Sequence, residues 1–580
     1  MGRSGTCPTC FNLVGVRQRI AALWTRVRRN EAQLSLALSL VIGAVVGLVV
    51  VAFIVLTGRL AVRMYPPGGA AWRRVLVPTL GSLVTGFLLV RYFPFARGSG
   101  IPQTKYALFV EEGRITMRTV VGKFVCCCTA LASGVSLGRE GPSVQVGAGI
   151  ASVISRQLGM SRSLVKSQLV SGSAAALAAA FNTPIAAVLF ALEEINGDLN
   201  APVLGSVVVA SATAWMVLHL FLGDEPLFHV SGYQLVHPVE FALYAALGVA
   251  GGLASVCFVK LLLWLRLKFR QWPRWTLWFQ PAVGGLTTGL IGWFYPEVMG
   301  AGYHYIDGVL NGNVVVKVLF ILAALKIIAT AVCYSSGNAG GIFGPSLFIG
   351  SMVGGAFGEV VHSLFPAYTA GPGAYALVGM GVAFAGIVRT PLTSVIMIFE
   401  MTRDYTIIVP LMISNLIAFF ISYELQHEPI YEALASQDGV HLPTAGAREQ
   451  LLRLRVSDAM TPPGEIFPPQ TPIAEALKQD RPVVVADERG LWGVIDPAKM
   501  KDIFLGSGML ADLFNGTPDG DNMPHLHTDH SLAIALDRMG SSNLRVLPVV
   551  SRANVHQLLG VVTLEAVLNA YGFSLPPPAA

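Results

Sequence analysis

The stretch GREGPSVQVG at residues 138–147 is the most informative part of the sequence, because a similar stretch, GIFGPSLFIG, returns at residues 341–350. The shared Gly-Pro-Ser cores begin at Gly141 and Gly344, 203 positions apart. Proline is favoured in the first turn of a helix, and neighbouring glycines let another backbone or a ligand approach closely. Each stretch therefore predicts a turn followed by the start of a helix.

A second pair of motifs follows these stretches at a similar distance. NTP at residues 182–184 begins a run that ends in Glu193 and Glu194, and RTP at residues 389–391 begins a run that ends in Glu400. By alignment of the two runs, Glu193 matches Glu400. Two similar halves in one membrane chain usually frame a site at their interface, so we expect the functional residues there.

The composition indicates an integral membrane protein, since 53% of the residues are hydrophobic, 13% are charged and the mean hydropathy is +0.60. Nearly charge-free runs recur between residues 34 and 423, and several are short or interrupted by Gly and Pro. Broken helices are tolerated at membrane depth only where protein or water covers them. We therefore expect an all-α polytopic membrane protein of broken, tilted helices, with no nucleic acid as partner.

The two ends of the chain differ from this pattern. Arginines precede the first apolar run, which at residues 34–58 is too long for a signal peptide, so residues 1–32 are predicted to be a cytoplasmic segment with an amphipathic basic helix. Cys7 and Cys10 form a lone CxxC without a second ligand pair, and no metal site is expected. After about residue 440, short apolar strands alternate with helical stretches, which predicts a soluble α/β module on the cytoplasmic side. The expected strands lie at residues 483–485, 493–495, 546–550 and 559–562.

Helix starts of this kind suit a small anion. Their exposed N–H groups and the helix dipole favour negative charge. GSGIP at residues 98–102 is a third such start and adds the hydroxyl of Ser99. Glu140 lies among these amides, where its ionised carboxylate would compete with the anion and its protonated form would leave. The alternative is a structural glutamate paired with Arg139.

Together these motifs resemble the CLC family of chloride channels and chloride/proton antiporters. The resemblance covers about residues 34–436 and rests on residues 98–102, 138–142, 341–345 and the tyrosine of PIY at 429–431, in the family's order. It implies the CLC fold of two inverted-repeat halves, and a homodimer in membrane lipid with one pore per subunit. It also implies a multi-pass protein, which we place in the bacterial inner membrane with both termini in the cytoplasm.

The resemblance sets the expected domain boundaries. The membrane domain is predicted at residues 33–436, with halves at about 33–223 and 238–436, and a linker follows at 437–455. VSDAMT at residues 456–461 begins a tail that resembles a pair of CBS domains. The two CBS domains are expected at residues 456–508 and 509–573.

The resemblance also implies roles for single residues. The hydroxyls of Ser99 and Tyr431 should contact a central anion, and the N–H groups of Ile342 and Phe343 should hold it from the other side. Alternatives for Ser99 and Tyr431 are a helix cap and a membrane-interface aromatic. The Phe343 side chain itself could simply pack. A hydroxyl at Ser99 suits chloride.

Amides from Arg139 to Gly141 should form an outer anion site with Glu140 as its gate. Glu194 matches the internal proton glutamate of the antiporters, where channels of the family commonly carry an apolar residue. The alternative interpretation is that Glu193 and Glu194 are interfacial charges that end a helix.

The sequence therefore favours chloride/proton antiport, and a passive voltage- or pH-gated chloride channel of the same fold is the alternative. No HExxH or other hydrolytic pattern indicates an enzyme.

CBS pairs often bind adenine nucleotides, usually through a Gly, two apolar residues, a Ser or Thr, two further residues and an Asp. Here Ala566 stands at the Asp position after Gly560 and Thr563, and Lys499 stands there in the first unit. Both units depart from the pattern. We therefore expect no required cofactor. A module that stabilises a dimer without ligand is at least as well supported as an adenine-nucleotide site at the CBS pair, which stays the alternative.

Overall fold

The computed structural model divides the chain into two compact units, Met1–Leu442 and Pro443–Ala580. It describes residues 31–440, except 67, 200–201, 225, 229, 231–232, 234 and 313–314, and residues 454–571, except 463–464, 480–482, 488–489, 496–507, 515–523, 543 and 556. The expected N-terminal basic helix, most of the predicted linker, Cys7, Cys10 and Lys499 lie outside the described residues.

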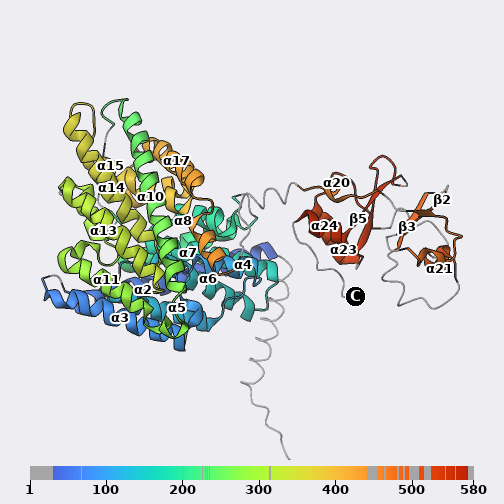
Figure 1. The fold of residues 1–580 in the computed structure, drawn as a ribbon, viewed down its shortest axis with the longest axis horizontal. Helices are drawn as coiled ribbons and strands as arrows, with labels where there is room; N and C mark the ends of the chain where they lie inside the picture. The colour runs from blue at the N-terminus through green and yellow to red at the C-terminus, as the bar shows by residue number, and fades with distance from the viewer. Residues whose placement is uncertain are drawn as a thin grey trace, which may run out of the picture. The chain divides into compact units, whose positions relative to one another are not determined.

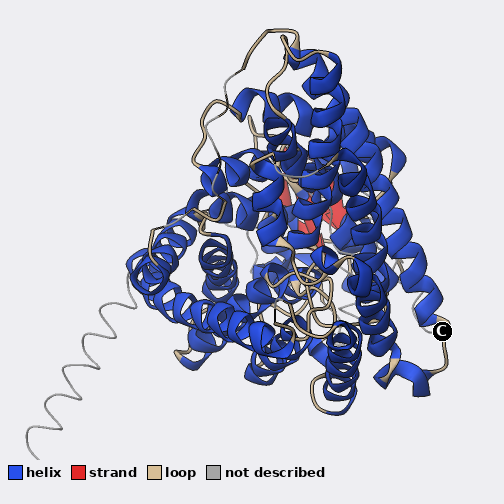
Figure 2. Ribbon diagram, turned by 90° about the vertical axis from the view of Figure 1, so that its left-hand side faces the viewer, coloured by secondary structure: helices blue, strands red, loops and turns tan. Residues whose placement is uncertain are grey.

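The first unit is helical (Figures 1 and 2). Its helices before residue 240 are α2 (Glu31–Met64), α3 (Ala71–Arg91), η1 (Pro94–Ala96), α4 (Ile101–Phe109), α5 (Met117–Ala132), α6 (Glu140–Gln157), α7 (Arg162–Phe181), α8 (Pro184–Phe190), η2 (Ala191–Asn196) and α9 (Leu204–Leu222). The later ones are α10 (Glu240–Arg270), η3 (Arg274–Trp278), α11 (Gln280–Phe294), η4 (Pro296–Val298), α12 (Tyr303–Leu310), α13 (Val316–Ser335), α14 (Phe343–Leu364), α15 (Pro372–Val388), α16 (Pro391–Thr402), α17 (Ile408–Leu425) and α18 (Ile430–Gln437).

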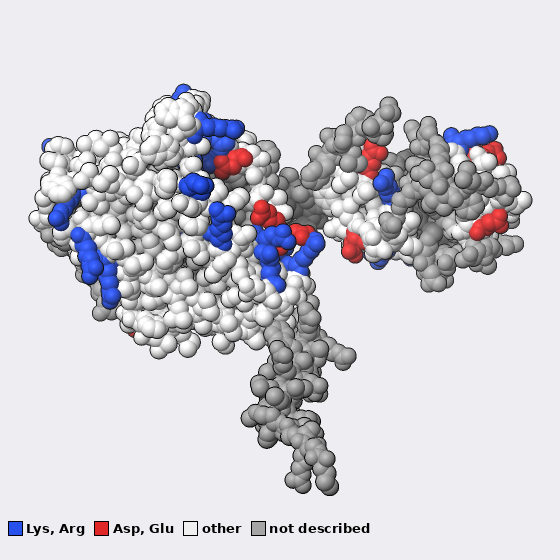
Figure 3. Space-filling view, turned by 90° about the horizontal axis from the view of Figure 1, so that it is seen from below, with Lys and Arg blue, Asp and Glu red and all other residues white. Residues whose placement is uncertain are grey.

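The expectation of a polytopic membrane protein agrees with the surface of this unit. Eight of the described helices are long and apolar enough to cross a membrane. Large apolar side chains face outward, among them Leu220 and Phe294, and the visible face carries few charged residues (Figure 3). Such an apolar surface is typical of contact with lipid rather than water.

The two similar stretches at residues 138–147 and 341–350 meet in space. Gly138 and Gly341 exchange two backbone hydrogen bonds of 2.7 Å as an antiparallel bridge. Immediately after the bridge, α6 and α14 begin at Glu140 and Phe343, as the Gly-Pro-Ser pattern predicted. The antiparallel pairing is what two halves of inverted orientation require.

Each of these helices then packs closely on the next long helix of its half, α6 on α7 and α14 on α15. The last glycine of each stretch makes this possible. A Cβ at Gly147 would collide with the carbonyl oxygen of Gly172, and a Cβ at Gly350 would collide with that of Gly379. The repeated glycines therefore set equivalent helix crossings in the two halves.

The halves also cap each other's short helices. Glu193 accepts hydrogen bonds from the N–H (2.9 Å) and hydroxyl (2.6 Å) of Thr393, in the first turn of α16. Glu400 accepts hydrogen bonds from the N–H groups of Ile185 (2.9 Å) and Ala186 (2.7 Å), in the first turn of α8. Glu193 thus corresponds to Glu400, as the alignment indicated, and both carboxylates satisfy helix N-termini.

The described residues of the second unit form two small sheets. Strands β1 (Ile466–Phe467), β2 (Val483–Asp487) and β3 (Gly490–Ile495) form one sheet, with β1 parallel and β3 antiparallel to β2. Strands β4 (Val546–Val550) and β5 (Leu558–Thr563) form an antiparallel pair. The four strands expected from the sequence are therefore present. The helices of this unit are α20 (Val456–Ala459), α21 (Ile473–Ala476), η5 (Leu510–Phe514), α23 (Leu532–Ser542) and α24 (Leu564–Ala570).

Candidate anion and proton site

The Glu140 carboxylate lies at the start of the other half's helix rather than along its own. It is fully buried, and its Oε2 accepts a hydrogen bond from the Gly344 N–H at 3.3 Å, in the first turn of α14. Its Oε1 accepts a hydrogen bond from the Tyr303 hydroxyl. A helix N-terminus favours any anion, so the side chain occupies a place that suits a transported anion equally well.

Arg139 interacts only loosely with this carboxylate. Its Nε is 4.0 Å from Glu140 Oε1 and has no hydrogen-bond partner among the described residues. The guanidinium instead lies 5.6 Å from the centre of the Tyr303 ring. The interpretation of Glu140 as one half of a structural Arg139 ion pair is therefore weak.

Tyr303 was not predicted from the sequence, although a signal for it exists. GAGY at residues 300–303 lies 202 positions after GSGI at residues 98–101. Each turn is stabilised by its own fully buried lysine. Lys123 Nζ donates to the Ala96 (3.1 Å) and Gly98 (2.6 Å) carbonyls, and Lys326 Nζ donates to the carbonyls of Val298 (2.9 Å) and Gly300 (2.6 Å). Tyr303 therefore begins the helix that corresponds to α4.

Ser99 and Tyr431 each have the features expected of a ligand contact. Both are fully buried, and neither hydroxyl finds a hydrogen-bond partner in the described part of the chain. The Tyr334 phenol lies beside Ser99 without the geometry of a hydrogen bond. Leaving a buried hydroxyl without a partner costs about 1–3 kcal/mol, so both hydroxyls fit a polar ligand.

The plainer interpretations of these two residues are wrong. Gly100, not Ser99, is the residue before α4, and its left-handed backbone (φ 104°) favours glycine. A Cβ there would lie 2.8 Å from the Gly141 carbonyl oxygen, so the turn brings Ser99 against the start of α6. Tyr431 has no exposed surface, which excludes a membrane-interface aromatic.

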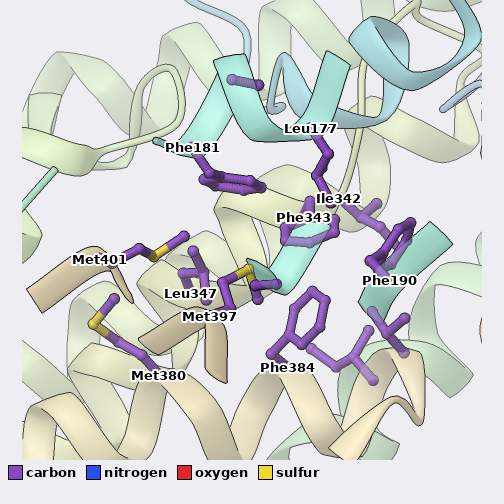
Figure 4. Close-up of a cluster of buried hydrophobic side chains, with 14 of the residues drawn as sticks. Leu177, Phe181, Phe190, Ile342, Phe343, Leu347, Met380, Phe384, Met397 and Met401 are labelled. Carbon is purple, nitrogen blue, oxygen red and sulfur yellow. The ribbon is translucent and has the colours of Figure 1, made fainter. Parts of the chain in front are cut away.

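Ile342 and Phe343 stand at the start of α14, where N–H groups have no acceptor inside the helix. The Phe343 side chain packs in an aromatic cluster (Figure 4). Its ring centre is 4.7 Å from that of Phe181, 5.5 Å from that of Phe190 and 4.3 Å from that of Phe384. The interpretation of this side chain as packing is confirmed.

Glu194 lies on η2, a single π-helical turn, and is 6% exposed. Its Oε1 accepts a hydrogen bond from Lys105 Nζ at 2.8 Å, and the same ammonium contacts Glu432. An interfacial charge is therefore the wrong description of Glu194. Neither Lys105 nor Glu432 was found from the sequence, because the two are 327 positions apart and only the fold joins them.

A cavity of about 710 Å³ reaches the turn that carries Ser99, with Gly98 and Tyr334 in its wall. Its lining includes five arginines and two acidic residues, namely Arg97, Arg114, Arg266, Arg270, Arg274, Glu111 and Asp438. Asp438 pairs with Arg266 (2.8 Å) and Arg270 (2.6 Å). The remaining positive charge attracts anions toward the turn.

The second unit provides less evidence for a functional site. The Thr563 hydroxyl accepts a hydrogen bond from the Ala566 N–H at 3.0 Å and so caps α24. Groups of His, Cys, Asp and Glu that could hold a metal ion are absent from the described residues.

Comparisons with known proteins agree with this geometry. Residues 81–423 match the family model of the voltage gated chloride channel, and residues 520–572 match that of the CBS domain. A protein of Vibrio campbellii named H(+)/Cl(-) exchange transporter ClcA is 32% identical over 62% of this chain and 78% of its own length. A protein of Ralstonia nicotianae named putative chloride channel protein ClcB-like is 32% identical over 65% of this chain and 89% of its own.

Solved structures show the same architecture. A slow cyanobacterial Cl-/H+ antiporter superposes with a TM-score of 0.65 and 26% identity, over 70% of this chain and 97% of the antiporter chain. A eukaryotic CLC transporter superposes with a TM-score of 0.63 and 22% identity, over 92% of this chain and 98% of its own, which supports the fold. With its paired half-motifs and the match over residues 81–423, this chain belongs to the voltage-gated chloride channel (CLC) family and carries a CBS domain in its tail.

Proposed function

We propose that this protein is a secondary active transporter that exchanges chloride for protons across a membrane. The observation that carries the proposal is the pair of buried carboxylates: Glu140 bound to the N-terminus of α14, and Glu194 on η2. A passive anion path has no need of a second buried acid. Relatives named as exchange transporters, and the solved antiporter, support the same conclusion.

Glu140 acts as the gate in this proposal. Its ionised carboxylate accepts hydrogen bonds from Gly344 and Tyr303 and excludes an anion from that position. Protonation removes the charge that favours the helix N-terminus, so the side chain leaves and chloride takes its place. Proton binding and anion binding are then alternatives at one position, which is the basis of exchange.

The anion path runs from the arginine-lined cavity to the turn at Ser99. There the hydroxyls of Ser99 and Tyr431 and the N–H groups of Ile342 and Phe343 would coordinate chloride. Amides from Arg139 to Gly141 would form the outer site. Neutral donors bind a small anion weakly enough for fast release, whereas a full positive charge would hold it.

A passive chloride channel remains the second candidate, because one relative carries a channel name. The two functions differ in one measurement. Proteoliposomes that contain the protein and an imposed chloride gradient should take up protons against their own gradient. If chloride moves and the internal pH does not change, the antiport proposal is refuted.

We further propose that the protein works as a homodimer in the inner membrane of a bacterium, with both termini in the cytoplasm. The apolar outer surface and the basic residues before α2 support this arrangement. We also propose that the CBS units stabilise the dimer without a required nucleotide, since Thr563 serves as a helix cap and Ala566 replaces the usual Asp.

A further inference from the structure

Three charged side chains from distant parts of the chain share one buried site. Lys105 on α4 is 4% exposed, Glu194 on η2 is 6% exposed, and Glu432 on α18 is 8% exposed. The Lys105 ammonium donates to Oε1 of Glu194 at 2.8 Å and to Oε1 of Glu432. Oε2 of Glu432 has no hydrogen-bond partner in the parts of the chain that the structure describes.

The charges of this site do not balance when every group is ionised. One ammonium faces two carboxylates, which leaves one uncompensated negative charge in a buried place, and such a charge is costly. The surrounding groups do not correct the imbalance. Glu193 adds a further carboxylate on η2, but it is engaged by Thr393. The positive charge of Arg389, which directly follows α15, attracts the Glu432 carboxylate electrostatically. Its guanidinium, however, donates its hydrogen bonds to the backbone carbonyls of Ser422 and Gln426.

Two neighbouring carboxylates in such a site lower their repulsion by holding one proton between them. The ammonium can then pair with whichever carboxylate is ionised. Moving the proton breaks the O–H bond of one carboxylic acid and forms an O–H bond on the other, while Lys105 stays an ammonium throughout. No other reactant is needed.

We propose that Glu432 is a second internal proton-carrying residue, which holds one proton jointly with Glu194 across Lys105. This inference rests on the proposed antiport function and adds a residue to it. Glu432 directly follows Tyr431 on α18, so the shared proton lies next to the residue that would contact the central anion. The residue that carries the proton and the residue that would contact the anion are then neighbours on one short helix.

Transport by the full-length protein tests the role of Glu432. In Glu432→Gln the side-chain oxygen still accepts a hydrogen bond from Lys105 but cannot exchange a proton, so the number of protons moved per chloride should fall. Glu432→Asp keeps the acid and should keep coupling. Glu240→Gln is a control, because Glu240 is also buried but accepts hydrogen bonds from Val236, Ala370 and Tyr375.

Infrared spectroscopy of the purified protein tests the shared proton without Glu432 variants. If one proton is shared, Glu194→Gln should remove one protonated-carboxyl band and leave the carboxylate bands unchanged, because Glu432 then pairs with Lys105 as an ion. Loss of a carboxylate band instead would overturn the inference. So would an unchanged proton-to-chloride ratio in Glu432→Gln when the unmodified protein is coupled. Absence of coupling in the unmodified protein would overturn the proposed function itself, and the inference with it.

Discussion

At the scale of single residues, the proposed function depends on a competition between a side chain and an ion. Glu140 reaches the N-terminus of α14 because the Gly138–Gly341 bridge sets the two helix starts against each other. The carboxylate has the charge that this position favours, so it holds the position until it is protonated. Tyr303 adds a second hydrogen bond that strengthens this hold.

Replacing Glu140 by glutamine should give chloride flux that no longer depends on pH. The amide has no charge to gain or lose, so it neither competes as an anion nor carries a proton. Chloride efflux from proteoliposomes at several pH values measures this. Glu424→Gln, an exposed carboxylate on α17, serves as the control. Retained pH dependence in Glu140→Gln would count against the gate.

Replacing Tyr303 by phenylalanine should weaken the hold of Glu140 on its position. A hydrogen bond to a charged group is worth about 1.5–3 kcal/mol, which corresponds to roughly ten- to a hundredfold in occupancy. Chloride should then compete more easily, so its apparent affinity in flux or calorimetric titrations should rise. Tyr305→Phe is the control, because this neighbour lies on the exposed side of α12. Equal affinities in the two variants would contradict the role of Tyr303.

Replacing Glu194 by glutamine should leave chloride moving while the coupled proton flux is lost. The amide removes the acid through which protons would reach Glu140 from the inner side. Simultaneous recording of chloride and pH in the same vesicles gives both fluxes. Unchanged proton transport in this variant would refute the assignment of Glu194.

At the scale of elements, local patterns predicted the helix starts well. Proline and glycine act on neighbouring residues only, so the turns and helix starts at α6 and α14 could be predicted from the Gly-Pro-Ser stretches. The contacts of Glu194 could not be placed in this way. Lys105, Glu194 and Glu432 come from three elements that only the packed fold brings together, and no spacing in the sequence encodes their meeting.

Replacing Gly147 by valine should destabilise the protein by about 1–3 kcal/mol or more, since the crossing of α6 and α7 has no room for a side chain. The thermal unfolding midpoint in detergent should fall. Gly58→Val provides the control, because a Cβ at Gly58 on α2 meets no other atom within 4 Å. If the two variants unfold at the same temperature, the glycine contact does not set the crossing.

At the scale of the whole molecule, composition and repeats predicted a membrane unit of two related halves followed by a soluble α/β unit. The antiparallel bridge and the reciprocal caps of Glu193 and Glu400 could not be read from the repeat alone, because a repeat does not reveal the orientation of its copies. The arginine-lined cavity was also missed, since its wall collects residues from many separate elements.

Coupling of chloride to protons distinguishes the proposed transporter from a passive channel. The most direct measurement is simultaneous recording of chloride and proton movement in proteoliposomes that contain the full-length protein, with a chloride gradient as the only driving force. We expect protons to move against their gradient in a fixed ratio to chloride. Chloride movement with no accompanying proton movement would contradict this expectation and leave a passive channel.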